Sequence, residues 1–163
     1  SASFSPDGSR VVTANSRGEA QVWDAKTGEL QLTLKGNAGA VRTASFSADG
    51  GRIVTAAGDA RVWDARTGDP LLTFKGHEGD VMSARFSTDG TRVLTAGKDA
   101  TAQVWDARTG KVLLALKGHP DSVYSAAFNA DGARVVTAGF DKTARVWDAK
   151  LDPQMLAFPK VDA

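Results

Sequence analysis

The sequence predicts an all-β protein built from four repeats of four short antiparallel strands. The first indication is a Trp-Asp pair that recurs and uses all 4 tryptophans of the chain. The copies are Trp23-Asp24, Trp63-Asp64, Trp105-Asp106 and Trp147-Asp148, which lie 40, 42 and 42 residues apart. A fixed spacing of this size indicates a repeat array. The composition agrees, since 17 glycines and only 5 prolines suit short strands joined by tight turns.

A second marker, Phe-Ser-x-Asp-Gly, predicts the first hairpin of each repeat. Its copies are Phe4–Gly8, Phe46–Gly50, Phe86–Gly90 and, with Asn in place of Ser, Phe128–Gly132. Asp-Gly favours a hairpin turn because Gly takes a positive φ at little cost and Asp bonds its own backbone. One strand should therefore end near each Phe, and a second should start after each Gly.

The second strand of each repeat is expected to be buried on both faces, because its residues are β-branched and almost continuously apolar. The copies are Arg10–Ala14, Arg52–Ala56, Arg92–Ala96 and Arg134–Ala138. The third strand ends at the Trp-Asp pair. Thr-Gly turns follow at Thr27-Gly28, Thr67-Gly68 and Thr109-Gly110, and each introduces a fourth strand with alternating apolar residues. A Gly-His pair, at Gly76-His77 and Gly118-His119, then opens the next repeat.

Four-stranded units of about 40 residues with Gly-His and Trp-Asp signatures resemble the blades of the WD-repeat β-propeller family. The resemblance extends from residue 1 to about residue 158. It implies a single repeat domain over residues 1–163, in which four four-stranded antiparallel blades form about half a ring. The blades are expected at about residues 1–35, 36–75, 76–117 and 118–159, with Gln154–Phe158 as the fourth strand of the last blade.

The same resemblance assigns two sets of polar residues to the structural tetrads of the family. They are His77, Thr95, Asp99 and Trp105 in the third repeat, and His119, Thr137, Asp141 and Trp147 in the fourth. A His with an Asp and a hydroxyl also fits a nucleophilic triad. The resemblance instead implies a chain of hydrogen bonds from Trp to Thr to His to Asp that holds strands and turns together. Asn37 replaces the His of the second repeat and Arg17 the Asp of the first, so the first two blades are expected to be less stable.

The resemblance also places partner binding on the face formed by the loops before the first strand and between the second and third strands. The residues at these places include Arg42, Asp80, Met82, Lys98, Tyr124 and Phe140. Arg, Met and aromatic side chains are enriched at the centres of protein interfaces. We therefore predict a protein-binding face at these six residues. The alternative is that Met82 or Tyr124 only packs against a neighbouring blade.

Composition argues against several other kinds of partner. The net charge of +1 provides no basic field for nucleic acid. No apolar run is long enough to span a membrane. The chain has no cysteine, and its 2 histidines are assigned to tetrads, so we expect no catalytic thiol, no metal site and no cofactor. The lack of cysteine fits a cytoplasmic location, and the Ala-, Gly-, Arg- and Val-rich composition fits a bacterial source.

These observations predict a non-enzymatic scaffold for protein–protein interaction. An open stack of blades leaves two apolar faces uncovered. Either two copies join about a two-fold axis as an eight-bladed homodimer, or further repeats of a longer array complete the ring. A purely architectural repeat fragment is one alternative. An enzyme that uses the central channel is another, although the small residues Ala2, Ala44, Ala84 and Ala126 on the first strands argue against chemistry there.

Overall fold

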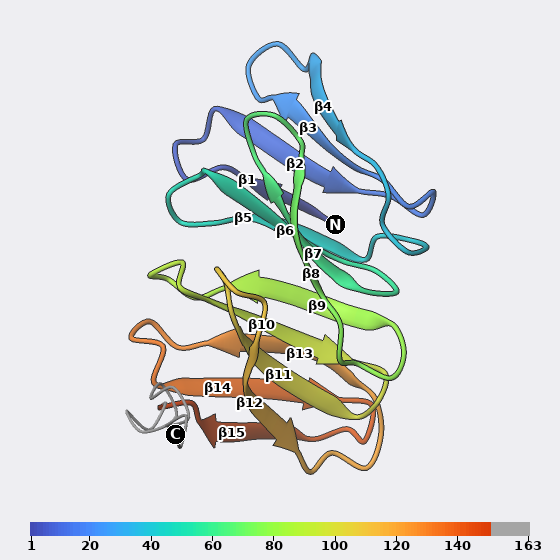
Figure 1. The fold of residues 1–163 in the computed structure, drawn as a ribbon, viewed down its shortest axis with the longest axis vertical. Helices are drawn as coiled ribbons and strands as arrows, with labels where there is room; N and C mark the ends of the chain where they lie inside the picture. Colours follow the sequence, from blue (N-terminus) through green and yellow to red (C-terminus); the bar gives the residue numbers. More distant parts are fainter. Residues whose placement is uncertain (151–163) are drawn as a thin grey trace, which may run out of the picture.

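A computed structural model describes residues 1–150 and confirms the all-β fold class. The described strands form four antiparallel sheets, three with 4 strands and the last with 3. The expected strand Gln154–Phe158 lies outside the described residues. Figure 1 shows the sheets following one another along the long axis of the molecule, from the first repeat to the last, without closing into a ring.

Within each sheet the strands pair in chain order. The first sheet contains β1 (Ala2–Phe4), β2 (Arg10–Ala14), β3 (Ala20–Asp24) and β4 (Leu30–Leu34). The second contains β5 (Thr43–Phe46), β6 (Arg52–Ala56), β7 (Ala60–Asp64) and β8 (Pro70–Phe74). The third contains β9 (Val81–Phe86), β10 (Arg92–Gly97), β11 (Thr101–Asp106) and β12 (Val112–Lys117). The fourth contains β13 (Val123–Phe128), β14 (Arg134–Gly139) and β15 (Ala144–Asp148).

Carboxylates hold the two kinds of turn that the sequence predicts. In the first hairpin, Asp7 accepts hydrogen bonds from the Ser5 hydroxyl at 2.6 Å and the Ser9 N–H at 3.0 Å. These bonds lower the pKa of Asp7 to about 2. After β3, Asp24 of the Trp-Asp pair accepts the N–H groups of Lys26 and Thr27 at 2.9 and 2.8 Å. The Trp-Asp pair therefore shapes the turn that leads into the fourth strand, and Gly28 supplies the positive φ of 74° that this turn needs.

The core consists of three apolar interfaces between neighbouring sheets. We call the side of a sheet that faces the next sheet in the chain its forward face, and the opposite side its rear face. In the first interface Val12, Val22 and Leu34 pack against Val41, Ile53 and Trp63. In the second Val54, Val62 and Phe74 pack against Val81, Val93 and Trp105, and in the third Leu94, Val104 and Leu116 pack against Val123, Ala126 and Val135. The first strands of neighbouring sheets, β1, β5, β9 and β13, also contact one another.

The expectation that every second strand is buried on both faces is right for β6 and β10 and wrong for β2 and β14. The residues that follow the initial Arg of β6 and β10 are all buried. In β14 burial alternates, with Val135 0% and Val136 43% exposed. The reason is that, within the described residues, the first and last sheets each have a neighbouring sheet on one face alone. Within residues 1–150, no helix is long and apolar enough to cross a membrane.

Candidate structural tetrads and protein-binding rim

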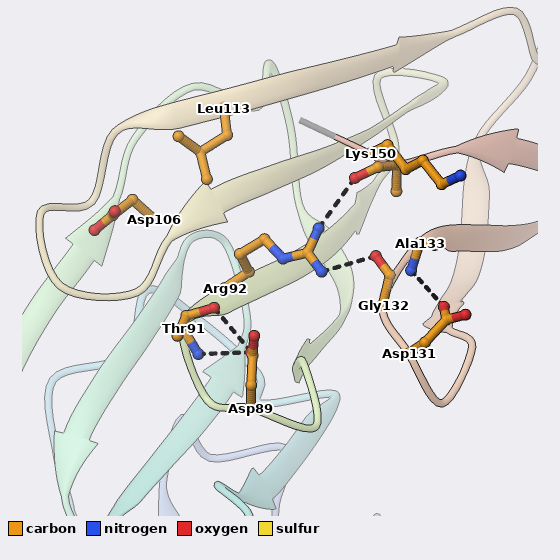
Figure 2. A pocket seen from close by; sticks show the side chains of 10 residues that line it. Asp89, Thr91, Arg92, Asp106, Leu113, Asp131, Gly132, Ala133 and Lys150 are labelled. Atoms are coloured by element: carbon orange, nitrogen blue, oxygen red, sulfur yellow. Dashed lines mark hydrogen bonds between the residues drawn. The ribbon is translucent and has the colours of Figure 1, made fainter. Parts of the chain in front are cut away.

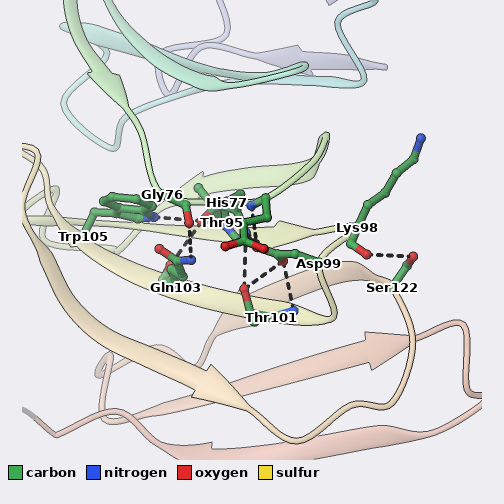
Figure 3. A network of polar contacts seen from close by, with 10 residues as sticks. Gly76, His77, Thr95, Lys98, Asp99, Thr101, Gln103, Trp105 and Ser122 are labelled. Carbon is green, nitrogen blue, oxygen red and sulfur yellow. Dashed lines mark hydrogen bonds and ion pairs between the residues drawn. The ribbon is translucent and has the colours of Figure 1, made fainter.

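The third sheet brings its four predicted tetrad residues into one chain of hydrogen bonds (Figure 3). The indole N–H of Trp105 donates to Oγ1 of Thr95 at 2.8 Å. Oγ1 of Thr95 lies 2.7 Å from Nε2 of His77, and Nδ1 of His77 lies 2.9 Å from Oδ2 of Asp99. An ionised carboxylate can only accept, so His77 donates from Nδ1, and in the neutral imidazole its Nε2 accepts the Thr95 hydroxyl. Every member of the chain is paired, as a buried polar network requires.

Asp99 is the anchor of this network. It also accepts the backbone N–H of Glu78 at 3.0 Å and the hydroxyl of Thr101 at 2.8 Å. Burial raises the pKa of Asp99, but hydrogen bonds from His77, Thr101 and Glu78 outweigh burial and leave the pKa below its ordinary value. The carboxylate therefore remains ionised at neutral pH and ties the turn after β10 to the loop before β9.

The fourth sheet repeats the arrangement. His119 lies 2.9 Å from Asp141 through Nδ1 and 2.8 Å from Thr137 through Nε2, while Trp147 donates to Thr137 at 2.8 Å. Here too the threonine that follows the aspartate by two positions, Thr143, donates its hydroxyl to the carboxylate, at 2.9 Å. Sequence reasoning missed Thr101 and Thr143, although an Asp-x-Thr pattern that occurs in both repeats marks them.

The first two sheets keep part of the network. In the second, Trp63 donates to Thr55 at 2.9 Å, and the Thr55 hydroxyl donates to the side-chain oxygen of Asn37 at 2.7 Å. Asp59 pairs with Arg61 at 2.9 Å rather than with Asn37. In the first sheet the bond from Trp23 to Thr13 remains, at 2.8 Å. The Trp–Thr bond is thus common to all four sheets, and the His–Asp extension belongs to the last two.

The predicted binding residues from the second and third sheets meet in an ionic cluster. Asp80, just before β9, lies 2.8 Å from both Arg42 of the second sheet and Lys98 of the third. Hydrogen bonds from Lys98 and Arg42 lower the pKa of Asp80. All three side chains are partly exposed. The cluster links the ends of two blades on one side of the molecule.

The predicted residues of the fourth sheet form an aromatic pair beside this cluster. The rings of Tyr124 and Phe140 lie 5.1 Å apart between centroids at 46°, and the two residues are 42% and 57% exposed. Ser122 connects the pair to the cluster, since its hydroxyl donates to the Lys98 carbonyl at 3.2 Å and its carbonyl accepts the Phe140 N–H at 2.8 Å. We call Arg42, Asp80, Lys98, Tyr124 and Phe140 the rim. The sixth predicted residue, Met82, is half-buried on β9.

The family model of the WD domain, G-beta repeat (WD40), matches residues 28–64, 68–106 and 110–148. Each match ends on a Trp-Asp pair, the residue pair around which the tetrads and the turns into the fourth strands are built. The chain belongs to the WD40 family. A comparison with curated proteins finds no match.

The matched WD40 repeats do not coincide with the sheets. Each match starts before the fourth strand of one sheet and runs through the third strand of the next. One WD40 repeat therefore contributes strands to two neighbouring blades, and the covalent chain ties the blades together in addition to their apolar contacts.

Among residues 1–150, no three His, Asp or Glu side chains gather in a way that could hold a metal ion. A cavity of about 540 Å³ lies between the third and fourth WD40 blades (Figure 2). It lies by the turns after β9 and β13, at the other ends of these strands from the rim. Two of its carboxylates, Asp89 and Asp131, are hydrogen-bonded within their own turns.

Proposed function

We propose that this WD40 chain is a non-catalytic scaffold that binds a protein partner through the rim. The observation that carries the proposal is the Tyr124–Phe140 pair, two large rings that contact each other while about half of each residue faces solvent. Paired exposed aromatics beside charged groups are typical of interface centres, because rings bury a large area at a small entropic cost. WD40 proteins typically act as protein-interaction scaffolds, which supports the same proposal.

The charges of the rim indicate the chemistry of the partner. The cations Arg42 and Lys98 share the single carboxylate of Asp80, which leaves one positive charge in excess. Ion pairs as exposed as these contribute little to stability, so they can rearrange when a partner arrives. A protein segment that presents a carboxylate next to an apolar or aromatic side chain would complement both parts of the rim.

The tetrads support the non-catalytic part of the proposal. The hydroxyls that a triad would use, those of Thr95 and Thr137, belong to residues that are 0% and 1% exposed, which leaves little room for a substrate. The first strands β5, β9 and β13 present the small residues Ala44, Ala84 and Ala126, all buried. We further propose that the arc of blades is completed by self-association or by further repeats.

A double variant, Tyr124→Ala with Phe140→Ala, is expected to weaken partner binding by at least about 30-fold, since truncating each interface ring costs about 1–3 kcal/mol. A partner captured with the wild-type chain would be purified, and its affinity for each variant measured by calorimetry. Matched controls are Leu71→Ala and Val112→Ala, which remove exposed apolar side chains on β8 and β12 and should bind normally.

Equal affinities for the double variant and the two controls would contradict binding through the rim. The far-ultraviolet circular dichroism and tryptophan fluorescence of the double variant should match those of the wild type, because both rings are largely exposed. Failure to capture any partner with the wild-type chain would favour the purely architectural alternative.

A further inference from the structure

One contact recurs at all three interfaces between sheets. The arginine that begins the second strand of a sheet reaches forward and lies over the phenylalanine that ends the first strand of the next sheet. Arg10 lies 5.1 Å from the ring centre of Phe46, Arg52 lies 4.9 Å from that of Phe86, and Arg92 lies 4.7 Å from that of Phe128. A guanidinium over a ring at this distance is attracted by the negative face of the ring.

The same guanidinium groups also donate to two backbone carbonyls of the next sheet. Arg92 donates to Gly132 at 2.7 Å (Figure 2). It also donates to Ala149 at 3.1 Å. Arg52 donates to the carbonyls of Gly90 and Ala107, and Arg10 to those of Gly50 and Ala65. We call this set, one Arg with the Phe ring and the Gly and Ala carbonyls of the next sheet, the clasp. Glycine suits this position because its φ is +69° at Gly50, Gly90 and Gly132 alike, and at Gly132 a Cβ would also meet the Arg92 guanidinium.

Among residues 1–150, the first and last sheets carry two halves of a fourth clasp that have no partner within these residues. Arg134 begins β14, as Arg92 begins β10, and it is exposed on the forward face of the last sheet. Phe4 ends β1 and is 67% exposed. Gly8 and Ala25 of the first sheet correspond to Gly132 and Ala149, whose carbonyls accept from Arg92, and both are exposed. A Cβ at Gly8 would meet nothing within 4 Å, in contrast to Gly132.

Apolar side chains accompany these halves. Val136 and Val146 on the forward face of the last sheet are 43% and 68% exposed, whereas Leu94 and Val104, at the same positions in the third sheet, are almost completely buried by the fourth. On the rear face of the first sheet, Trp23 is only half-buried, whereas Trp63 and Trp105 are buried. Each uncovered face thus carries the residue types that meet inside the stack.

We infer that the forward face of the fourth sheet binds the rear face of the first sheet of a second copy of this chain, with Arg134 completing the clasp on Phe4, Gly8 and Ala25. The inference rests on the proposal above that the arc is completed by further blades, and it names the contact. The contact joins unlike faces, so two of them related by a two-fold axis close two arcs into one eight-bladed ring. A second copy is favoured as the binding partner because its first sheet carries the same residues that meet the forward faces at the three internal interfaces.

The test is the mass of the 163-residue chain measured by sedimentation velocity from low to high micromolar concentration. The wild type is expected to form a dimer. Phe4→Ala should weaken the dimer by at least about 5-fold, because it removes a charge–ring contact from both interfaces. Arg134→Ala should weaken it by at least about 100-fold, because it removes the same contacts and the carbonyl bonds as well. Arg66→Ala, which removes an exposed arginine in the turn before β8, is the control and should dimerise normally.

Mixing the two variants tests the direction of the contact. In a mixed dimer, Arg134 of the Phe4→Ala copy meets Phe4 of the Arg134→Ala copy, so one clasp is intact. The mixed dimer should therefore be tighter than the dimer of Arg134→Ala alone. A wild-type chain that remains monomeric throughout, a dimer that neither substitution affects, or a mixed dimer no tighter than that of Arg134→Ala would each overturn the inference. None of these outcomes would contradict partner binding through the rim, because Tyr124 and Phe140 are not part of the clasp.

Discussion

Leu94→Asp is expected to unfold the chain at neutral pH, whereas Val136→Asp is expected to change its stability by no more than about 1 kcal/mol. The two residues hold the same position in β10 and β14. Leu94 is 1% exposed and packs against the fourth sheet, while Val136 is 43% exposed on the uncovered forward face. Leu94→Asp loses about 1.5–3 kcal/mol of apolar burial and places an unpaired carboxylate in the core. The sum approaches the whole stability of a domain, about 5–15 kcal/mol.

Urea denaturation monitored by circular dichroism measures the free energy of unfolding of the wild type and of Val136→Asp, and the spectrum without urea shows whether Leu94→Asp is folded. The concentration should be low enough that the chain is monomeric, since Val136 lies on the face proposed to bind a second copy. If Leu94→Asp and Val136→Asp destabilised the folded chain equally, the fourth sheet would not cover the third as described.

Trp105→Ala is expected to cost about 3–5 kcal/mol, a typical loss for a buried aromatic side chain. Trp105 is 1% exposed, packs against Phe74 with ring centres 5.2 Å apart, and donates the hydrogen bond that satisfies Thr95. The matched variant is Trp23→Ala. Trp23 makes the same bond to Thr13 at 2.8 Å, but it is only half-buried. Its loss should therefore cost about half as much.

Thermal and urea unfolding of the two tryptophan variants check this difference. Because both substitutions remove the same kind of hydrogen bond, the difference between them reports the packing of the neighbouring sheet. A Trp23→Ala variant as unstable as Trp105→Ala would contradict an uncovered rear face on the first sheet.

The strands and turns could be predicted from the sequence because their causes are local. Asp-Gly and Trp-Asp each act within a few residues, as Asp7 and Asp24 show by bonding backbone N–H groups two or three positions away. Burial of the second strands could be predicted only where the stack is complete. The sequence of β14 resembles that of β10, and only the absence of a described neighbouring sheet makes Val136 exposed.

The candidate sites were predicted less completely, because their contacts cross between sheets. The repeat positions of Arg42, Asp80 and Lys98 suggested one face, but not that the two cations share one carboxylate. The clasp has a sequence signature, since Arg and Phe recur in every repeat, but nothing in the sequence shows that Arg92 reaches Phe128 of the following sheet. Such contacts depend on how blades stack, which no single repeat encodes.

The rim and the clasp are two different kinds of candidate interface on the WD40 arc. The clasp occurs at all three interfaces between sheets within the chain. A further clasp would therefore bind another blade of the same kind. The residues of the rim differ from repeat to repeat, so the rim does not match any contact between blades within the chain. Surfaces that vary while the scaffold repeats are the usual place for recognition.

The central claim is that four like blades stack so that the inner two are covered on both faces and the outer two on one. Hydrogen exchange measured by mass spectrometry at low protein concentration tests it most directly, since exchange reports local opening. We predict the slowest exchange in β6 and β10 and faster exchange in β2 and β14, because burial by two neighbouring sheets outweighs the missing His–Asp bond that made the second blade look less stable from sequence. Only β2 and β14 should gain protection as the concentration rises. Equal protection of all four second strands at low concentration, or slower exchange in β14 than in β10, would contradict the stack.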